Sequence, residues 1–177
     1  SATIRLHQIK FSSKTGVPKV DKGLLMCYNM GNLKNPSTKN SIIETEEMKK
    51  YLGNINNYSL PLDIALPLFN WVVYFSNNTY KGIISTINPE QLTVAGKQSG
   101  NEFIFTTDTI VNNIPFGKGD KLRIEESSRE ELAKAIDYLQ KKLPNNKKIT
   151  VSFYHLDELI LNKHPQDELE IFYNSFH

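Results

Sequence analysis

Polar and aromatic side chains follow four apolar runs of this sequence, at residues 4–8, 24–29, 62–71 and 149–158. Parallel strands of α/β sheets and barrels carry their ligand-binding residues at the carboxyl ends. Each run is therefore predicted to be a parallel strand whose end contributes hydrogen-bonding and ring-stacking groups to a site. The candidate ligand-binding residues are His7, Tyr28, Asn29, Asn70, Trp71, Tyr154 and His155.

Trp71, with Asn70 as a polar neighbour, offers a platform for sugar stacking. It is the single tryptophan of the chain, and an indole ring at a strand end can stack on a sugar ring. The competing interpretation is core packing, because a tryptophan buries ~150–250 Å² wherever it lies. Tyr28 and Asn29 have the same two interpretations, since strand ends form sites in barrels but also have to be capped and packed.

Arg5 and His7 are two residues apart, so on a strand they share one face. If Ile4 and Leu6 pack against outer helices, Arg5 and His7 point inward, and a buried arginine needs a carboxylate partner. One hypothesis is a buried polar cluster with Asp63. The other is a substrate clamp with His7 at the mouth of the site.

The last apolar run ends in His155, Asp157 and Glu158. Asp157 and Glu158 are the candidate catalytic carboxylates, although hydrolysis of a glycoside needs two carboxylates at a suitable separation. His155, Asp157 and His7 could in principle form a metal site. No metal-binding motif supports that hypothesis, and a solvated strand end explains these residues more simply. We therefore predict neither a metal nor a cofactor.

Composition excludes several classes of function. The chain has 177 residues, 39% of them hydrophobic, which is enough for one core. A net charge of +2 with scattered lysines argues against binding to nucleic acid. Cys27 is the only cysteine and lies in an apolar run, so a buried thiol is expected rather than a nucleophile, a disulfide or a cysteine metal cluster. No run reaches the ~20 apolar residues of a membrane span.

The N-terminus passes directly into a predicted strand at residues 3–6, without a leader or loop. We therefore expect a piece of a longer protein, exported to the periplasm or the cell surface, although a native start is also consistent with the sequence.

Helices are predicted between the apolar runs. Ser41 and Glu44 are spaced as a capping box before a helix that turns Met48, Leu52 and Ile55 inward. Ser127 and Ser128 start a second helix, which ends at Pro144. A last helix at 165–176 is expected to turn Leu169, Phe172 and Tyr173 inward and Asp167, Glu168 and Glu170 toward solvent.

Residues 72–126 follow a different pattern, with short apolar pieces separated by turns such as Asn77-Asn78. We expect a β-rich insertion with a short helix around 89–92. The remainder alternates strands and helices, which favours a parallel sheet. The fold class predicted is α/β, as one (β/α) barrel-like domain over 1–177, with four strands making half of an eight-stranded barrel.

The strand ends also resemble a known family. Residues 26–29, Met-Cys-Tyr-Asn, resemble the Met-x-Tyr-Asp/Asn ending of the sixth strand in chitinase-type glycoside hydrolases. Residues 66–71 resemble the Pro-x-aromatic ending of their seventh strand. Together with residues 3–10 and 62–67, most of the chain is similar to the C-terminal half of an uncharacterised bacterial family of TIM barrels, distantly similar to those hydrolases.

The resemblance implies a carbohydrate partner, with Tyr28 and Asn29 hydrogen-bonding a sugar or orienting an acid. It also implies that the acidic strand with the catalytic carboxylates lies upstream of this chain. The chain departs from the pattern in its fourth run, where Tyr154 and His155 replace the tryptophan platform of the eighth chitinase strand.

Two hypotheses for function remain. One is a glycoside-hydrolase-like protein that binds or hydrolyses a glycan at the strand ends. The other is a non-catalytic binding or structural module in which the same residues pack or contact a protein. Four barrel strands alone leave two unpaired edges, so we expect either a missing N-terminal half, a homo-oligomer, or cover from residues 72–126.

Overall fold

The computed structural model describes residues 1–84, 87, 92, 95–143, 148–155, 161 and 164–176. The chain divides into two compact units. We call Ser1–Gly31, Ile42–Phe69 and Ser127–His177 the parallel unit, and Asn32–Ser41 and Asn70–Glu126 the β unit. One domain over 1–177 with an insertion at 72–126 stays a prediction.

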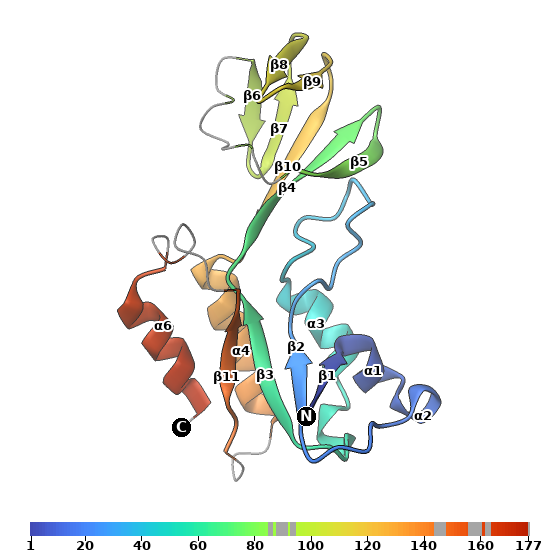
Figure 1. Ribbon diagram of the computed structural model, residues 1–177, viewed down its shortest axis with the longest axis vertical. Helices are drawn as coiled ribbons and strands as arrows, with labels where there is room; N and C mark the ends of the chain where they lie inside the picture. Colours follow the sequence, from blue (N-terminus) through green and yellow to red (C-terminus); the bar gives the residue numbers. More distant parts are fainter. Residues whose placement is uncertain are drawn as a thin grey trace. The chain divides into compact units, whose positions relative to one another are not determined.

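The parallel unit is built on a sheet that, in the described residues, has four parallel strands (Figure 1). They are β1 (Ala2–Arg5), β2 (Gly23–Met26), β3 (Leu62–Pro67) and β11 (Val151–Tyr154). Their order in the sheet, β1-β2-β3-β11, is also their order in the chain. The four apolar runs therefore do form parallel strands, as predicted, and each ends at the same edge of the sheet.

Two of the predicted strands were too long. The first ends at Arg5, because helix α1 (Leu6–Lys10) begins at the next residue, so Arg5 and His7 do not share a strand face. The third ends at Pro67. Asn70 and Trp71 belong instead to β4 (Asn70–Ser76) in the antiparallel sheet of the β unit.

The two faces of the parallel sheet differ in burial. On one face Ile4, Leu25, Ile64 and Val151 lie side by side across the strands, and all are at most 2% exposed. On the other face Arg5 is exposed and its neighbour Met26 is half-buried. Further across the same face, Ala65 of β3 is only 3% exposed. A parallel sheet is normally covered on both faces, so the exposure of this second face at β1 and β2 is unusual.

Helices of the parallel unit bury apolar stripes, as their spacing predicted. The helical segments are α1, α2 (Ser12–Thr15), α3 (Thr45–Leu52), η1 (Ile55–Asn57), α4 (Arg129–Lys142), α6 (Gln166–Tyr173) and η3 (Asn174–Phe176). Met48 and Leu52 are fully buried in α3. The Ser128 Oγ accepts the Glu131 N–H at 3.3 Å and caps α4.

Other expectations about these helices were wrong. Helix α3 begins at Thr45 rather than after Ser41, because Ser41 is a buried part of the β unit. In α6, Tyr173 is 45% exposed, whereas Glu168 is buried. Glu168 lies 3.3 Å from the His164 Nδ1 and 3.4 Å from the Arg129 Nε, and these polar partners make its burial tolerable.

The β unit contains antiparallel strands in the order β5-β4-β10-β7-β6, counted over the described residues, beside a β8-β9 hairpin. Their bounds are Thr79–Ile84 (β5), Gly96–Ser99 (β6), Glu102–Phe105 (β7), Thr109–Val111 (β8), Ile114–Phe116 (β9) and Lys121–Glu126 (β10). Asn77 and Asn78 have positive φ in the β4-β5 turn, as two-residue hairpins require. The helix expected at 89–92 lies, except for Leu92, outside the described residues.

Candidate functional site

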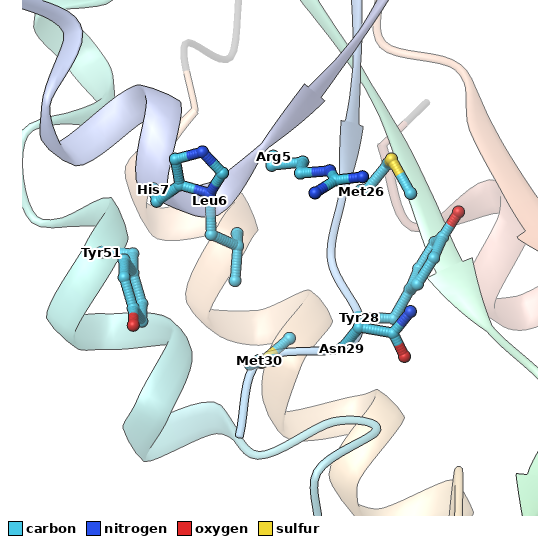
Figure 2. A pocket seen from close by; sticks show the side chains of 8 residues that line it. All are labelled: Arg5, Leu6, His7, Met26, Tyr28, Asn29, Met30 and Tyr51. Atoms are coloured by element: carbon cyan, nitrogen blue, oxygen red, sulfur yellow. The ribbon is translucent and has the colours of Figure 1, made fainter. Parts of the chain in front are cut away.

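A pocket of about 270 Å³ lies at the carboxyl ends of β1 and β2 in the parallel unit. Figure 2 shows the side chains around it. The lining residues are Arg5, Leu6, His7, Met26, Tyr28, Asn29, Met30 and Tyr51. Three of the candidate ligand-binding residues, His7, Tyr28 and Asn29, therefore lie around one cavity. Tyr51 was missed because it comes from helix α3, and its sequence context carries no sign of a site.

Arg5 is the last residue of β1, and the end of this strand positions it at the pocket. Its backbone N–H donates to the Gln8 Oε1 at 2.8 Å, which fixes the turn from strand into α1. The guanidinium extends toward Met26 in Figure 2. The expected cluster with Asp63 was wrong, because Asp63 pairs with Lys22 at 2.6 Å and accepts the Thr150 N–H. Within the described part of the chain, Arg5 has no ion-pair partner.

Tyr28 and Asn29 follow β2 and are held by backbone hydrogen bonds. The Asn29 N–H donates to the Ile42 carbonyl at 2.8 Å, and Asn29 adopts a left-handed φ of 55°, which asparagine tolerates. The Asn29 side chain stays exposed at the pocket. Burial raises the pKa of Tyr28, and the neighbouring Tyr154 raises it further, so the phenol keeps its proton and can donate a hydrogen bond.

Aromatic rings gather beside the pocket at the same edge of the sheet. We call Tyr28, Phe69, Tyr154 and His155 the aromatic cluster. Tyr28 and Tyr154 are stacked, with ring centroids 5.4 Å apart and planes 9° from parallel. Phe69 meets both edge-on at 6.0 Å, and His155 lies 6.4 Å from Phe69. Tyr154 and His155 were predicted from the strand end, whereas Phe69 was not singled out.

The remaining predicted residues lie elsewhere. Asn70 and Trp71 are in the β unit, where the Trp71 Nε1–H donates to the Glu125 Oε2 at 2.7 Å. The candidate catalytic residues Asp157 and Glu158 lie outside the described residues. Over the residues that are described, no group of three or more His, Cys, Asp or Glu side chains could hold a metal ion. Cys27 is fully buried, and burial raises the pKa of its thiol, as expected for a packing residue rather than a nucleophile.

A buried polar cluster in the β unit also escaped prediction. The Arg123 Nε donates to the Glu125 Oε1 at 2.5 Å, and both side chains are at most 1% exposed. The Glu125 Oε2 accepts hydrogen bonds from Trp71 and from the N–H and hydroxyl of Ser41. We call these four residues the Arg123 cluster. Its signal in the sequence is a pair of opposite charges two residues apart in the short strand β10, where they share a face.

Arg123 also holds the segment 32–41 in place within the β unit through hydrogen bonds. Its guanidinium donates to the backbone carbonyls of Asn35 at 2.8 Å and Leu33 at 3.1 Å. Its charge lies 5.1 Å from the centre of the Phe75 ring. Arg123 and Glu125 thus form their hydrogen bonds with other residues of the β unit, which indicates a structural role for this buried pair.

None of the helices in the described part of the chain has the length and apolar character needed to cross a membrane.

No family model and no curated protein matches this sequence. Among solved structures, the spore cortex-lytic enzyme SleL of Bacillus cereus is similar over 99% of this chain and 40% of its own, with 10% identity and a TM-score of 0.54. A chitinase from Chromobacterium violaceum is similar over 81% of this chain and 44% of its own, with 11% identity and a TM-score of 0.45.

This chain spans less than half the length of either structure. The likeness to SleL supports a mixed α/β fold. At 10% identity it is a likeness of fold alone.

Proposed function

We propose that this chain supplies four consecutive strands of a glycoside-hydrolase-like (β/α) barrel and binds a carbohydrate at their carboxyl ends. The strand order supports the barrel. Open doubly wound sheets reverse their strand order at a switch point, whereas β1, β2, β3 and β11 are neighbours in the order of the chain. Sequential parallel neighbours are what a closing barrel requires.

The exposed second face of the parallel sheet supports the same proposal. In a barrel that face lines the interior, which is filled by side chains from all the strands. Here it carries the exposed Thr3 and Arg5, the half-buried Leu24, Met26 and Asp63, and the buried Ala65. Further strands beside β1 and β11, from the rest of a longer polypeptide or from a second copy, would cover this face and both edges.

The observation that carries carbohydrate binding is the stacked pair of Tyr28 and Tyr154 beside the pocket. Tyr154 is 52% exposed although Tyr28 stacks on its ring and Phe69 and His155 lie beside it, so about half of its surface remains open to a sugar. Asn29 offers both amide donors and an amide acceptor at the adjoining pocket. A rigid aromatic platform next to a few polar groups is the usual composition of a small-molecule site.

The test is a glycan array and a polysaccharide pulldown with the natural full-length polypeptide. We expect Tyr154→Ala to weaken binding roughly 5- to 150-fold, taking the roughly 1–3 kcal/mol by which an aromatic ring stabilises a stacked nucleobase as the guide for a sugar. The matched control is Tyr173→Ala, because Tyr173 is 45% exposed on α6 and lies outside the aromatic cluster. Equal losses in the two variants, or no glycan bound by the unmodified protein, would refute the proposal.

Hydrolysis is a second candidate and needs more than the described site contains. The residues that line the pocket include neither Asp nor Glu. A glycosidase needs two carboxylates, about 5–9.5 Å apart depending on its stereochemistry. Asp157 and Glu158, or carboxylates of another part of the polypeptide, would have to supply them. Release of reducing ends from a bound glycan, abolished by Asp157→Asn or Glu158→Gln, would establish hydrolysis.

The Trp71 platform stays a prediction. Its indole N–H is already used by Glu125 in the β unit, so the core-packing interpretation accounts for its polar atom. The expected export to the periplasm or cell surface is likewise a proposal.

A further inference from the structure

The pocket at the ends of β1 and β2 holds positive charge without a carboxylate to balance it. Arg5 and His7 line the pocket, and none of the other lining residues is acidic. Neither side chain forms an ion pair within the part of the chain that the structure describes. A guanidinium that faces a cavity and is unpaired there is available to a ligand.

Charged groups on the neighbouring helices do not reverse this balance. Lys10 on α1 places its ammonium 5.2 Å from the ring centre of Tyr51, which lines the pocket, and so adds positive charge. The acidic residues Glu46 and Glu47 on α3 are paired with Lys49 and Lys50 of the same helix. The local field of the pocket is therefore positive and favours an anionic group.

The planar shape of the Arg5 guanidinium further restricts the class of ligand. A planar guanidinium matches a carboxylate with two parallel hydrogen bonds. The Asn29 amide and the Tyr28 hydroxyl, at the same pocket, match sugar hydroxyls. The Met26 and Met30 side chains suit the apolar faces of a sugar ring.

We infer that the glycan bound here carries carboxylate groups, and that Arg5 binds a sugar carboxylate in this pocket. The inference rests on the proposed carbohydrate function and names the class of sugar: a uronic acid or another acidic sugar rather than a neutral one. Arg5 is a specificity-determining residue in this arrangement, while the aromatic cluster supplies binding that does not depend on charge.

The experiment compares acidic glycans with neutralised forms of the same glycans. The probes are galacturonate, glucuronate and alginate oligosaccharides, each with its carboxyl-reduced counterpart, and sulfated galactan oligosaccharides. Binding to the natural full-length polypeptide is measured by titration calorimetry at two salt concentrations. We expect at least one carboxylated probe to bind about tenfold or more tightly than its reduced counterpart, because a hydrogen bond to a charged group is stronger than one to a neutral hydroxyl.

Arg5→Gln should remove this preference, because it should lower the affinity for the carboxylated probe much more than the affinity for its reduced counterpart. Arg5→Lys should retain part of it, since lysine keeps the charge but loses the bidentate geometry. Lys14→Gln is the matched control, because it removes one positive charge from the exposed face of α2, outside the pocket. Unchanged circular dichroism would show that Arg5→Gln folds, as expected for an exposed side chain.

The outcomes separate this inference from the proposed function. Equal affinity for acidic and reduced probes, or an effect of Lys14→Gln as large as that of Arg5→Gln, would overturn the inference and leave carbohydrate binding intact. Binding of sulfated probes alone would overturn the carboxylate assignment. Binding of no glycan at all would overturn both.

Discussion

The two units of this protein treat their polar side chains in opposite ways. In the β unit, Arg123 and Glu125 are buried, paired, and hydrogen-bonded to Ser41 and Trp71. In the parallel unit, Arg5 and Asn29 stand exposed at strand ends, and Arg5 has no ion pair within the described residues. A buried polar group has to be satisfied internally for the unit to fold, whereas an exposed and unpaired one remains available to a ligand.

Among substitutions that test this difference between the units, Arg123→Met should lower the unfolding free energy most. This change leaves the Glu125 carboxylate buried without its cation, which costs about 3–5 kcal/mol of unfolding free energy. Urea unfolding followed by hydrogen exchange should show lost amide protection in β4, β7 and β10, with β1 to β3 retaining theirs. Equal loss in both units would contradict a role confined to the β unit.

The double variant Arg123→Met with Glu125→Gln is the control for that prediction. It removes both charges and keeps an acceptor for Trp71 and Ser41, so part of the lost stability should return. A double variant no more stable than Arg123→Met alone would mean that lost packing, rather than the unpaired charge, caused the loss.

Truncation of a core side chain in the parallel unit should destabilise that unit rather than the β unit. Leu25→Ala removes a fully buried side chain from the covered face of the parallel sheet and should cost about 2–5 kcal/mol. Hydrogen exchange should then show lost protection in β1, β2 and β3. Leu24→Ala, on the half-buried second face, is the matched control and should cost clearly less. Equal costs would contradict the difference between the two faces.

A smaller effect is expected at the start of α4. Ser128→Ala removes the side-chain acceptor of the Glu131 N–H and should cost about 1 kcal/mol, measured by thermal or urea unfolding. Ser128→Asp should retain most of the stability, because aspartate also caps helices well. Loss of the same size in both variants would argue against capping.

The smallest effect expected is on how the unfolding free energy of the β unit depends on pH in acid. Burial alone would raise the pKa of Asp120, but hydrogen bonds from the Tyr74 hydroxyl and the Gly117 N–H outweigh it and hold the pKa below its ordinary value. The unfolded carboxyl titrates near about 4. Its contribution to stability is therefore complete above that pH and is lost as the pH falls through the lower, folded-state pKa.

Asp120→Asn should accordingly flatten the fall in unfolding free energy of the β unit below about pH 4. The control is Asp108→Asn, because Asp108 is exposed. An unchanged acid dependence in Asp120→Asn would contradict the assignment.

Sequence pattern located the elements better than it located their ends. The runs at 24–29 and 62–71 do give strands, but these end at Met26 and Pro67, while Met48 and Leu52 are buried as their helical spacing predicts. The turn from β1 into α1 was missed, because an apolar run continues smoothly through Leu6 and Ile9 into the helix. Tyr28 and Asn29 were predicted to bind a ligand from their place at the strand end, and both line the pocket, whereas Tyr51 was missed because it reaches the pocket from a helix.

The sequence by itself determined the parallel strands, the helices with their apolar stripes, and the chemistry at the strand ends, because these depend on neighbours within a few residues. Only the tertiary structure decided that Arg123 is bonded to Asn35 and Leu33, about 90 positions away, and that Asp63 pairs with Lys22 rather than with Arg5. The physical reason is that burial and charge pairing are set by residues distant in the chain. The residues next to a charged side chain in the sequence do not show whether that side chain will be buried in an ion pair or exposed to a ligand.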